Sequence, residues 1–276
     1  MSPIQIQHLS IGKGHPLAFI LGPCVIEDRT TMLQTAEFLH PLFQKYPCIF
    51  KSSFDKANRS SITSYRGPGL DGGLQILQEI SEQFGFLLTT DIHEVHQVQA
   101  VAEICDLLQV PAFLSRQTDL LLAAAKTQKP INVKKGQFMA PEDTKQVIEK
   151  VRSMKNANLL LTERGTCFGY HTLINDMRAI PTMQALGVPV CFDMSHSVQR
   201  PSAHGTHSGG DKQHAYTLAK AAIAAGANAI FLETHPSPSK ARCDQETQLA
   251  LEQLDTLLSQ LTKLHAFVQN GPAVHV

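Results

Sequence analysis

The sequence of 276 residues has no excess of charge of either sign, because 24 lysines and arginines balance 24 aspartates and glutamates. A chain without net positive charge creates no global field that would attract nucleic acid or an acidic membrane surface. We therefore expect neither nucleic acid nor a membrane as a partner. Any affinity for phosphate must come from a local cluster of cations.

Paired cysteines and export or membrane signals are also missing. The six cysteines form no C-x-x-C pair and most lie in apolar runs, which is typical of reduced thiols in the cytosol rather than of a disulfide framework. The first ten residues lack the basic head and apolar core of a secretory signal. No uncharged apolar run approaches the roughly 20 residues that cross a bilayer. These absences predict a cytoplasmic protein.

Eight short apolar runs alternate with longer segments of helical character. The predicted strands are residues 17–26, 48–54, 86–92, 107–113, 130–134, 159–163, 189–194 and 229–234. The predicted helices are residues 30–45, 72–84, 94–103, 117–127, 141–154, 175–186, 213–225 and 246–268. Runs that are almost continuous in apolar and β-branched residues are typical of strands covered on both faces. The alternation predicts an α/β fold, a single (β/α)8 TIM barrel domain spanning residues 1–276.

A doubly wound sheet is the alternative fold, but it usually carries a glycine-rich phosphate fingerprint after its first strand. No such fingerprint follows residues 17–26. Residues 1–16 precede the first barrel strand and form a short N-terminal extension. The sequence is compatible with either a small hairpin or a plug at the N-terminal end of the barrel.

A basic stretch follows the second predicted strand. It carries four cations, Lys51, Lys56, Arg59 and Arg66, among serines and an asparagine. A guanidinium grips phosphate oxygens in pairs, an ammonium adds a point charge, and small polar residues allow close approach of the backbone. The stretch indicates phosphate binding, with a solvated basic loop as the alternative.

Polar residues recur at the carboxyl ends of the predicted strands, where the loops of a barrel form its active face. They are Cys24, Lys51, Lys56, Asp91, His93, Lys134, Arg164, His196, Glu233 and His235. The opposite rim shows no comparable set. This asymmetry favours an enzyme over a barrel whose charges only keep it in solution.

Three of these cations, Lys56, Lys134 and Arg164, would form a floor suited to a small substrate that carries both phosphate and carboxylate. A second set offers a thiolate, an imidazole and two carboxylates, which suit a divalent transition metal with water completing its shell. Its members are Cys24, His196, Glu233 and Asp244. Cys24 could instead be a buried structural cysteine, and His196 could be a hydrogen-bonded loop histidine.

Motifs along nearly the whole barrel resemble the 3-deoxy-D-manno-octulosonate 8-phosphate synthase family. They are GPC at 22–24, KSSFDKANRSS at 51–61, TDIHE at 90–94, QVPAFL at 109–114, RQTDL at 116–120, INVKKGQF at 131–138, ERG at 163–165, FGY at 168–170, Asp193, HSVQ at 196–199, SGG at 208–210 and ETHP at 233–236. The resemblance implies condensation of phosphoenolpyruvate with D-arabinose 5-phosphate and water in lipopolysaccharide biosynthesis.

Carried over by motif, the resemblance makes Lys56, Gln109, Lys134 and Arg164 the phosphoenolpyruvate ligands, with Lys51 and Ser53 close by. Asn58, Arg59 and Ser60 would hold the pentose phosphate, and Asp91 its hydroxyls. Arg116 would reach the substrate of a neighbouring subunit, which implies a homotetramer. The catalytic set is then Lys56, Lys134, Arg164, His196 and Asp244.

The family also divides by metal use. Metal-dependent members carry cysteine after Gly22-Pro23, so Cys24 implies a site for manganese, iron, cobalt or zinc, completed by His196, Glu233 and Asp244. The chain departs from the pattern at 242–246, which lacks the Gly-Pro that often follows Asp244, and at Asp211-Lys212, where the family loop usually continues to arginine.

Rival functions remain at this stage. A 3-deoxy-D-arabino-heptulosonate 7-phosphate synthase shares the barrel but takes a four-carbon sugar phosphate, and the KANRSS string favours the pentose enzyme over it. A Schiff-base aldolase would need a low-pKa lysine, for which Lys134 is a candidate. A non-catalytic sugar-phosphate-binding barrel would leave the metal and acid–base candidates unexplained. The Gly/Ser/His-rich segment 202–212 is open as a mobile lid or a plain surface loop.

Overall fold

Eight parallel strands close into a ring in the computed structural model, which describes residues 1–201 and 209–271. The strands are β3 (Ala18–Gly22), β4 (Cys48–Lys51), β5 (Leu88–Asp91), β6 (Leu107–Val110), β7 (Ile131–Lys134), β8 (Leu159–Glu163), β11 (Val190–Asp193) and β14 (Ala229–His235). They pair in chain order, and the parallel pairings of β14 with β3 and with β11 close the ring. The predicted (β/α)8 barrel is thereby confirmed.

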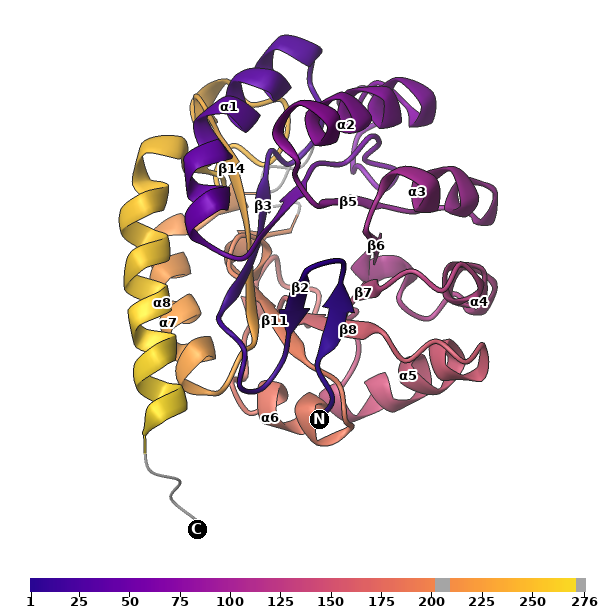
Figure 1. Cartoon of the computed structure of the whole chain (residues 1–276), viewed down its shortest axis with the longest axis vertical. Coiled ribbons are helices and arrows are strands. Elements are labelled where there is room, and N and C mark those ends of the chain that lie inside the picture. Colours follow the sequence, from indigo (N-terminus) through magenta and orange to yellow (C-terminus); the bar gives the residue numbers. More distant parts are fainter. Residues whose placement is uncertain (202–208, 272–276) are drawn as a thin grey trace.

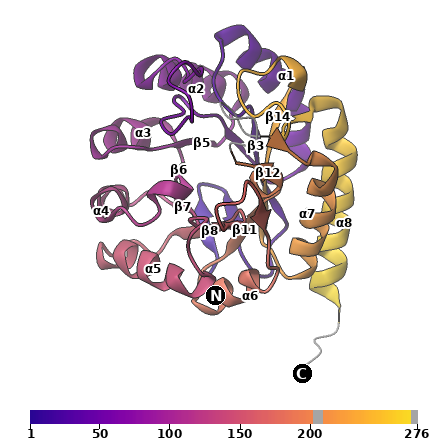
Figure 2. The ribbon, with the colours of Figure 1, turned by 180° about the vertical axis from the view of Figure 1, so that it is seen from behind.

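A ring of helices surrounds the barrel, as Figures 1 and 2 show from opposite sides. The helices are α1 (Arg29–Lys45), α2 (Leu70–Phe84), α3 (Val98–Ile104), α4 (Thr118–Lys126), α5 (Thr144–Ser153), α6 (Ala179–Ala185), α7 (Ala215–Ala224) and α8 (Leu254–Asn270). Every residue of the eight barrel strands is buried. This two-sided burial explains why the strands are rich in apolar and β-branched residues.

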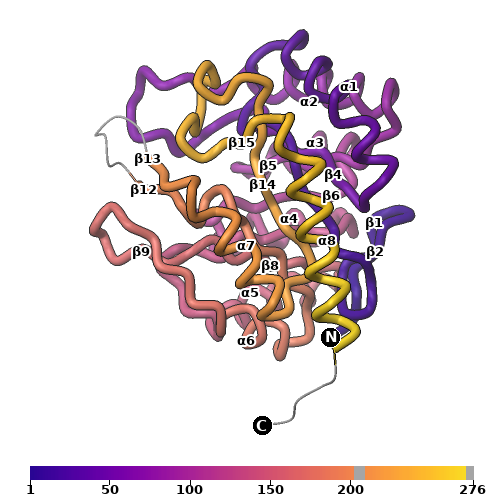
Figure 3. The backbone as a smooth tube through the Cα atoms, turned by 90° about the vertical axis from the view of Figure 1, so that its left-hand side faces the viewer, coloured from indigo at the N-terminus to yellow at the C-terminus, as the bar shows by residue number. Residues whose placement is uncertain are grey.

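The N-terminal extension is both a hairpin and a plug. Strands β1 (Ile4–Ile6) and β2 (Leu9–Ile11) pair antiparallel, and their isoleucines join Ile20, Leu107 and Phe231 in one buried cluster inside the barrel. Figure 3 shows the hairpin at the opposite end of the barrel from β9 (Thr166–Cys167), β12 (Gln199–Arg200) and β13 (Gly209–Gly210). The carboxyl ends of the strands are therefore the open end.

Several predicted boundaries were wrong. The helix predicted at 246–268 begins at Leu254, because β15 (Leu249–Ala250) first pairs with β14. The helix predicted at 175–186 begins at Ala179, after an antiparallel pair of β9 with β10 (Leu173–Ile174). Short 3-10 helices occupy Val95–Gln97, Ala112–Leu114, Pro141–Asp143, His196–Val198, Lys212–His214, Pro238–Lys240 and Leu251–Gln253. Among the described helices, none combines the length and apolar character required to span a bilayer.

Candidate active site

A cavity of about 220 Å³ opens at the carboxyl ends of the strands. Twelve of the residues singled out from the sequence line it: Lys51, Lys56, Asn58, Arg59, Ser60, Asp91, His93, Gln109, Lys134, Arg164, His196 and Asp244. Cys24, Ser53 and Glu233 lie in the layer beneath and are fully buried. The lining residues come from seven different strands or their following loops and thus converge on one space.

Lys134 and Arg164 form a desolvated cationic floor. Burial lowers the pKa of both side chains, against the opposing influence of Asp193. Lys134 Nζ bonds Asp193 and lies 3.3 Å from the centroid of the Phe231 ring. Arg164 donates through Nη2 to Gln199 Oε1 at 3.0 Å, while its buried Nη1 has no hydrogen-bond partner among the described residues. A buried guanidinium nitrogen without a partner is suited to receive an anion.

Lys56 stands over the opposite side of the floor, with Nζ 3.9 Å from Glu233 Oε1. Burial works to lower its pKa, but the surrounding Cys24 and Glu233 raise it well above the usual value. The Lys56 side chain therefore stays an ammonium. At 3.9 Å from Glu233 the ammonium is too far for a hydrogen bond to that carboxylate, so its N–H groups remain available to a substrate anion.

The structure places Lys51 as a support rather than as a free cation. It is 1% exposed, and its Nζ donates to Glu233 Oε1 and to the Cys24 carbonyl, each at 2.9 Å. Although burial opposes ionisation, Lys51 and His196 lower the pKa of Glu233 to about 2. Lys51 thus holds Glu233 ionised at the end of β14.

A hydrogen-bonded chain fixes Asp91. Ser53 Oγ and Gln109 Nε2 each donate to one of its carboxylate oxygens. Asn132 Nδ2 donates to Gln109 Oε1 at 3.1 Å. Burial works to raise the pKa of Asp91, but Lys51 and Lys56 lower it below its usual range. The ionised carboxylate is therefore held at the cavity wall with both oxygens oriented.

The loop after β4 carries Asn58, Arg59 and Ser60 to the cavity mouth. Arg59 donates through Nη1 to Cys243 Sγ at 3.0 Å and through Nη2 to the Arg242 carbonyl at 3.2 Å. Its buried Nε has no hydrogen-bond partner among the described residues. The guanidinium therefore bridges the basic loop and the loop that carries Asp244.

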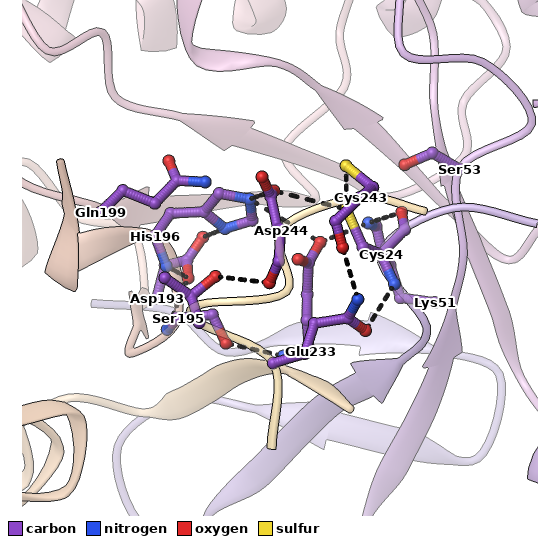
Figure 4. A network of polar contacts seen from close by, with 12 residues as sticks. Cys24, Lys51, Ser53, Asp193, Ser195, His196, Gln199, Glu233, Cys243 and Asp244 are labelled. Atoms are coloured by element: carbon purple, nitrogen blue, oxygen red, sulfur yellow. Dashed lines mark hydrogen bonds and ion pairs between the residues drawn. The ribbon is translucent and has the colours of Figure 1, made fainter. Parts of the chain in front are cut away.

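The predicted metal set falls into two overlapping groups that share Asp244. His196, Glu233 and Asp244 form one group, and Cys24, Cys243 and Asp244 form the other, with the donor atoms of each within 4.8 Å of one another. Figure 4 shows Asp244 between His196 on one side and the two cysteines on the other. The sequence did not identify Cys243 as a candidate.

The donor separations fit a transition metal. His196 Nε2 lies 3.7 Å from Glu233 Oε1 and 3.7 Å from Asp244 Oδ2, and Cys24 Sγ lies 3.4 Å from Asp244 Oδ2. Donors bound tetrahedrally at about 2.0–2.3 Å lie about 3.3–3.8 Å apart. Both the spacing and the mixture of thiol, imidazole and carboxylate therefore suit a divalent ion of this kind.

Asp193, at the end of β11, orients His196. It accepts the His196 backbone N–H at 2.8 Å, the Ser195 N–H at 3.1 Å and His196 Nδ1 at 2.7 Å, besides Lys134. Burial works to raise its pKa, but His196 and Lys134 lower it below its usual range. Because Nδ1 is engaged, Nε2 is the nitrogen that faces Glu233 and Asp244.

Two further sequence predictions concern Arg116 and the segment 202–212. Arg116 is exposed and does not line it. Most of the lid candidate at 202–212 lies outside the described residues. Asp211, one of the described residues of this segment, accepts a hydrogen bond from Arg200, with Oδ2 2.7 Å from Nε.

Comparison with known proteins identifies a family that this chain matches over most of its length. The model of the DAHP synthetase I family matches residues 1–270. A 2-dehydro-3-deoxyphosphooctonate aldolase of Protochlamydia amoebophila is 50% identical over 271 residues, which cover 98% of each chain. Proteins of the same name from Desulfosudis oleivorans and Syntrophobacter fumaroxidans are each 52% identical, over 264 residues (95% of each chain) and 251 residues (90% of this chain and 87% of the relative).

Proposed function

Because this chain belongs to the DAHP synthetase I family, we propose that it condenses phosphoenolpyruvate with D-arabinose 5-phosphate and water. The products are 3-deoxy-D-manno-octulosonate 8-phosphate and inorganic phosphate, and the reaction belongs to lipopolysaccharide biosynthesis. The observation that carries this proposal is 50% identity over 98% of the chain to a relative named 2-dehydro-3-deoxyphosphooctonate aldolase. The cavity supports it with a cationic floor and a separate basic loop, as two anionic substrates require.

Phosphoenolpyruvate would lie on the floor, with its phosphate and carboxylate among Lys56, Lys134 and Arg164. The unpartnered Arg164 Nη1 is directly available to such an anion. The methylene carbon of phosphoenolpyruvate attacks the aldehyde carbon of the pentose, whose oxygen takes a proton. Water then adds to the former enol carbon, and phosphate leaves. Charge grows on groups that these cations already hold, so fixed cations in a desolvated site stabilise the transition state.

The pentose phosphate would bind at the mouth of the cavity, where Asn58, Arg59 and Ser60 lie. This placement turns the sugar's aldehyde inward, toward the floor. Asp91 stands at the wall between the two sites, with its carboxylate oriented by Gln109, and would accept hydrogen bonds from the sugar hydroxyls.

We further propose that Cys24, His196, Glu233 and Asp244 hold a divalent transition metal, with manganese, iron, cobalt and zinc as the candidates. Such an ion, when bound, supplies a Lewis acid that acidifies water or polarises an aldehyde. Asp193 and Lys51 support the set, because they hold His196 and Glu233 in place.

A cytoplasmic homotetramer of single-domain subunits completes the proposal. Six free cysteines suit a reducing compartment. Arg116 is exposed and follows Phe113, whose side chain is 56% exposed. An exposed arginine three positions after an exposed aromatic residue suits contact with a second copy, where Arg116 would reach the neighbour's substrate.

Release of phosphate from phosphoenolpyruvate tests the function in three arms: arabinose 5-phosphate, erythrose 4-phosphate and no sugar. We expect release with the pentose only. Preference for erythrose 4-phosphate would support the heptulosonate rival that the family's name favours, and no release with either sugar would support a binding barrel.

Metal removal tests the second part of the proposal. Prolonged chelation should abolish turnover, and one of the four candidate ions should restore it. Full turnover by protein that elemental analysis shows to be free of transition metal would overturn the metal proposal while leaving the synthase proposal intact.

A further inference from the structure

Cys243 lies beside Cys24 although the two residues are 219 positions apart. Their sulfurs are 2.9 Å apart, and the side chains are 3% and 0% exposed. To share one tetrahedral ion the two sulfurs would move apart by about 1 Å. Both residues are free cysteines. Two buried sulfurs next to a carboxylate, Asp244, form a donor group for a metal that does not depend on His196 or Glu233.

The backbone turns two successive side chains toward one centre. Asp244 has a φ of 49°, in the left-handed region that residues other than glycine rarely adopt. Such conformations persist where the surroundings enforce them, and they cluster at functional sites. Here the turn brings Cys243 and Asp244 to the same side, facing Cys24 (Figure 4).

One side chain fastens both cysteine segments. Gln248 Nε2 donates to the Cys243 carbonyl at 2.8 Å, and Gln248 Oε1 accepts the Cys24 backbone N–H at 3.3 Å. The Gln248 amide thus sets the spacing between the two loops that carry the sulfurs. A donor pair held in this way is preorganised for a shared ligand.

The charge around Cys243 also suits a thiolate ligand. Arg59 Nη1 donates to Cys243 Sγ at 3.0 Å, so a guanidinium stands against the negative charge that a metal-bound sulfur carries. A buried cysteine with a purely structural role needs no such partner.

We propose that Cys243 is a second thiolate ligand of the metal held by Cys24 and Asp244. The inference rests on the proposed metal site and deepens it, because two thiolates select softer ions. Thiolate ligands favour zinc over manganese, which prefers oxygen donors. The proposal therefore narrows the four candidate ions toward zinc.

X-ray absorption spectroscopy of the reduced full-length protein loaded with zinc tests the proposal directly. We expect two sulfur scatterers per zinc in the wild type and one in Cys243→Ser. Loaded with cobalt, Cys243→Ser should lose about half of the sulfur-to-cobalt charge-transfer absorption. Its zinc affinity, measured by competition with a chelator, should fall by at least about tenfold. Cys105→Ser, at a buried cysteine outside the cavity, is the matched control and should keep both sulfurs.

The outcomes separate this inference from the metal proposal beneath it. One sulfur per zinc in the wild type would overturn the role of Cys243 and leave Cys24 as the sole thiolate. Failure of the wild type to bind zinc or cobalt would overturn both. Because the wild-type sulfur count decides the question, the test stands even if Cys243→Ser folds poorly.

Discussion

Replacing Lys135 with methionine should destabilise the barrel although Lys135 lies outside the cavity lining. Lys135 is 1% exposed, and its Nζ lies 3.6 Å from Glu163 Oε2 and donates to the Met139 carbonyl at 3.1 Å. Lys135 directly follows Lys134 in the sequence, and Glu163 directly precedes Arg164. Lys134 and Arg164 are the two cations of the floor. The buried ion pair therefore joins the ends of β7 and β8 behind the residues proposed to hold phosphoenolpyruvate.

The expected size of the effect follows from what the substitution leaves behind. Methionine nearly fills the space of lysine, so the main cost is an unpaired buried carboxylate. Glu163 keeps the Gly165 N–H, which donates to Oε1 at 2.7 Å, but its Oε2 has no hydrogen-bond partner among the described residues. Breaking a buried pair by removing one partner costs about 3–5 kcal/mol, whereas replacing both partners is close to neutral.

Urea unfolding followed by circular dichroism measures this prediction. We expect Lys135→Met to lower the free energy of unfolding by about 3–5 kcal/mol, and the added change Glu163→Gln to restore most of it. Lys145→Met is the matched control, because Lys145 is 64% exposed and lies 3.9 Å from Glu149 on the surface of α5. That variant should change the free energy by less than about 0.5 kcal/mol.

The reasoning would be refuted if Lys135→Met and the control had the same free energy of unfolding, or if the added Glu163→Gln deepened the loss. A folded Lys135→Met should also show a raised KM for phosphoenolpyruvate with little change in the pentose phosphate constant, since only the floor is displaced.

Three further predictions concern binding, assembly and stability. Arg59→Ala should raise the KM for arabinose 5-phosphate by roughly ten- to a hundredfold through loss of a charge-assisted hydrogen bond; an effect confined to phosphoenolpyruvate in steady-state titrations would contradict it. Mixing Arg116→Ala with a chain inactivated at Lys134 should restore partial activity, and no recovery despite proven subunit exchange would argue against a shared site. Asp28→Ala should lower the free energy of unfolding in urea at pH 7 by about 0.5–2 kcal/mol, because Asp28 caps α1 by accepting the Thr31 N–H at 2.8 Å. That bond lowers the pKa of Asp28 in the folded state. The cap therefore stabilises the protein above the pKa of Asp28 in the unfolded chain, and this stabilisation is lost as the pH falls through the pKa in the folded state. The charged cap would be refuted if the variant and the wild type differed in free energy of unfolding by the same amount at low pH as at pH 7.

The barrel could be predicted from the sequence because its strands carry the signal in their own residues. A strand buried on both faces is largely apolar up to its carboxyl end, so the runs at 18–22 and 159–163 identify themselves. The helix predicted at 246–268 starts too early because its first residues follow a distant strand rather than their own local pattern. Residues 249 and 250 pair with β14, and pairing with a distant strand overrides a local helical pattern.

The sequence predicted many of the residues that meet at the cavity, but not how they pair with one another. Position at a strand end was enough to identify Lys51 and Glu233. That Lys51 is occupied by Glu233 and by the Cys24 carbonyl depends on three strands meeting in space. Residue type alone predicts that such a lysine contacts the substrate, and only the structure shows that its ammonium also holds Glu233 in place.

The segment around Asp244 shows why a departure from a motif need not weaken a site. The missing Gly-Pro left the path of this loop open, because glycine tolerates conformations that other residues pay strain to adopt. The structure holds the path with side chains instead. Glu27 Oε1 accepts the Arg242 N–H at 2.6 Å, and Gln245 Nε2 donates to the Ala241 carbonyl at 2.6 Å. A left-handed residue costs of order 1–3 kcal/mol, and each such bond returns about 1 kcal/mol. The strain at Asp244 is therefore offset nearby, and the same loop carries Cys243 to the proposed metal site.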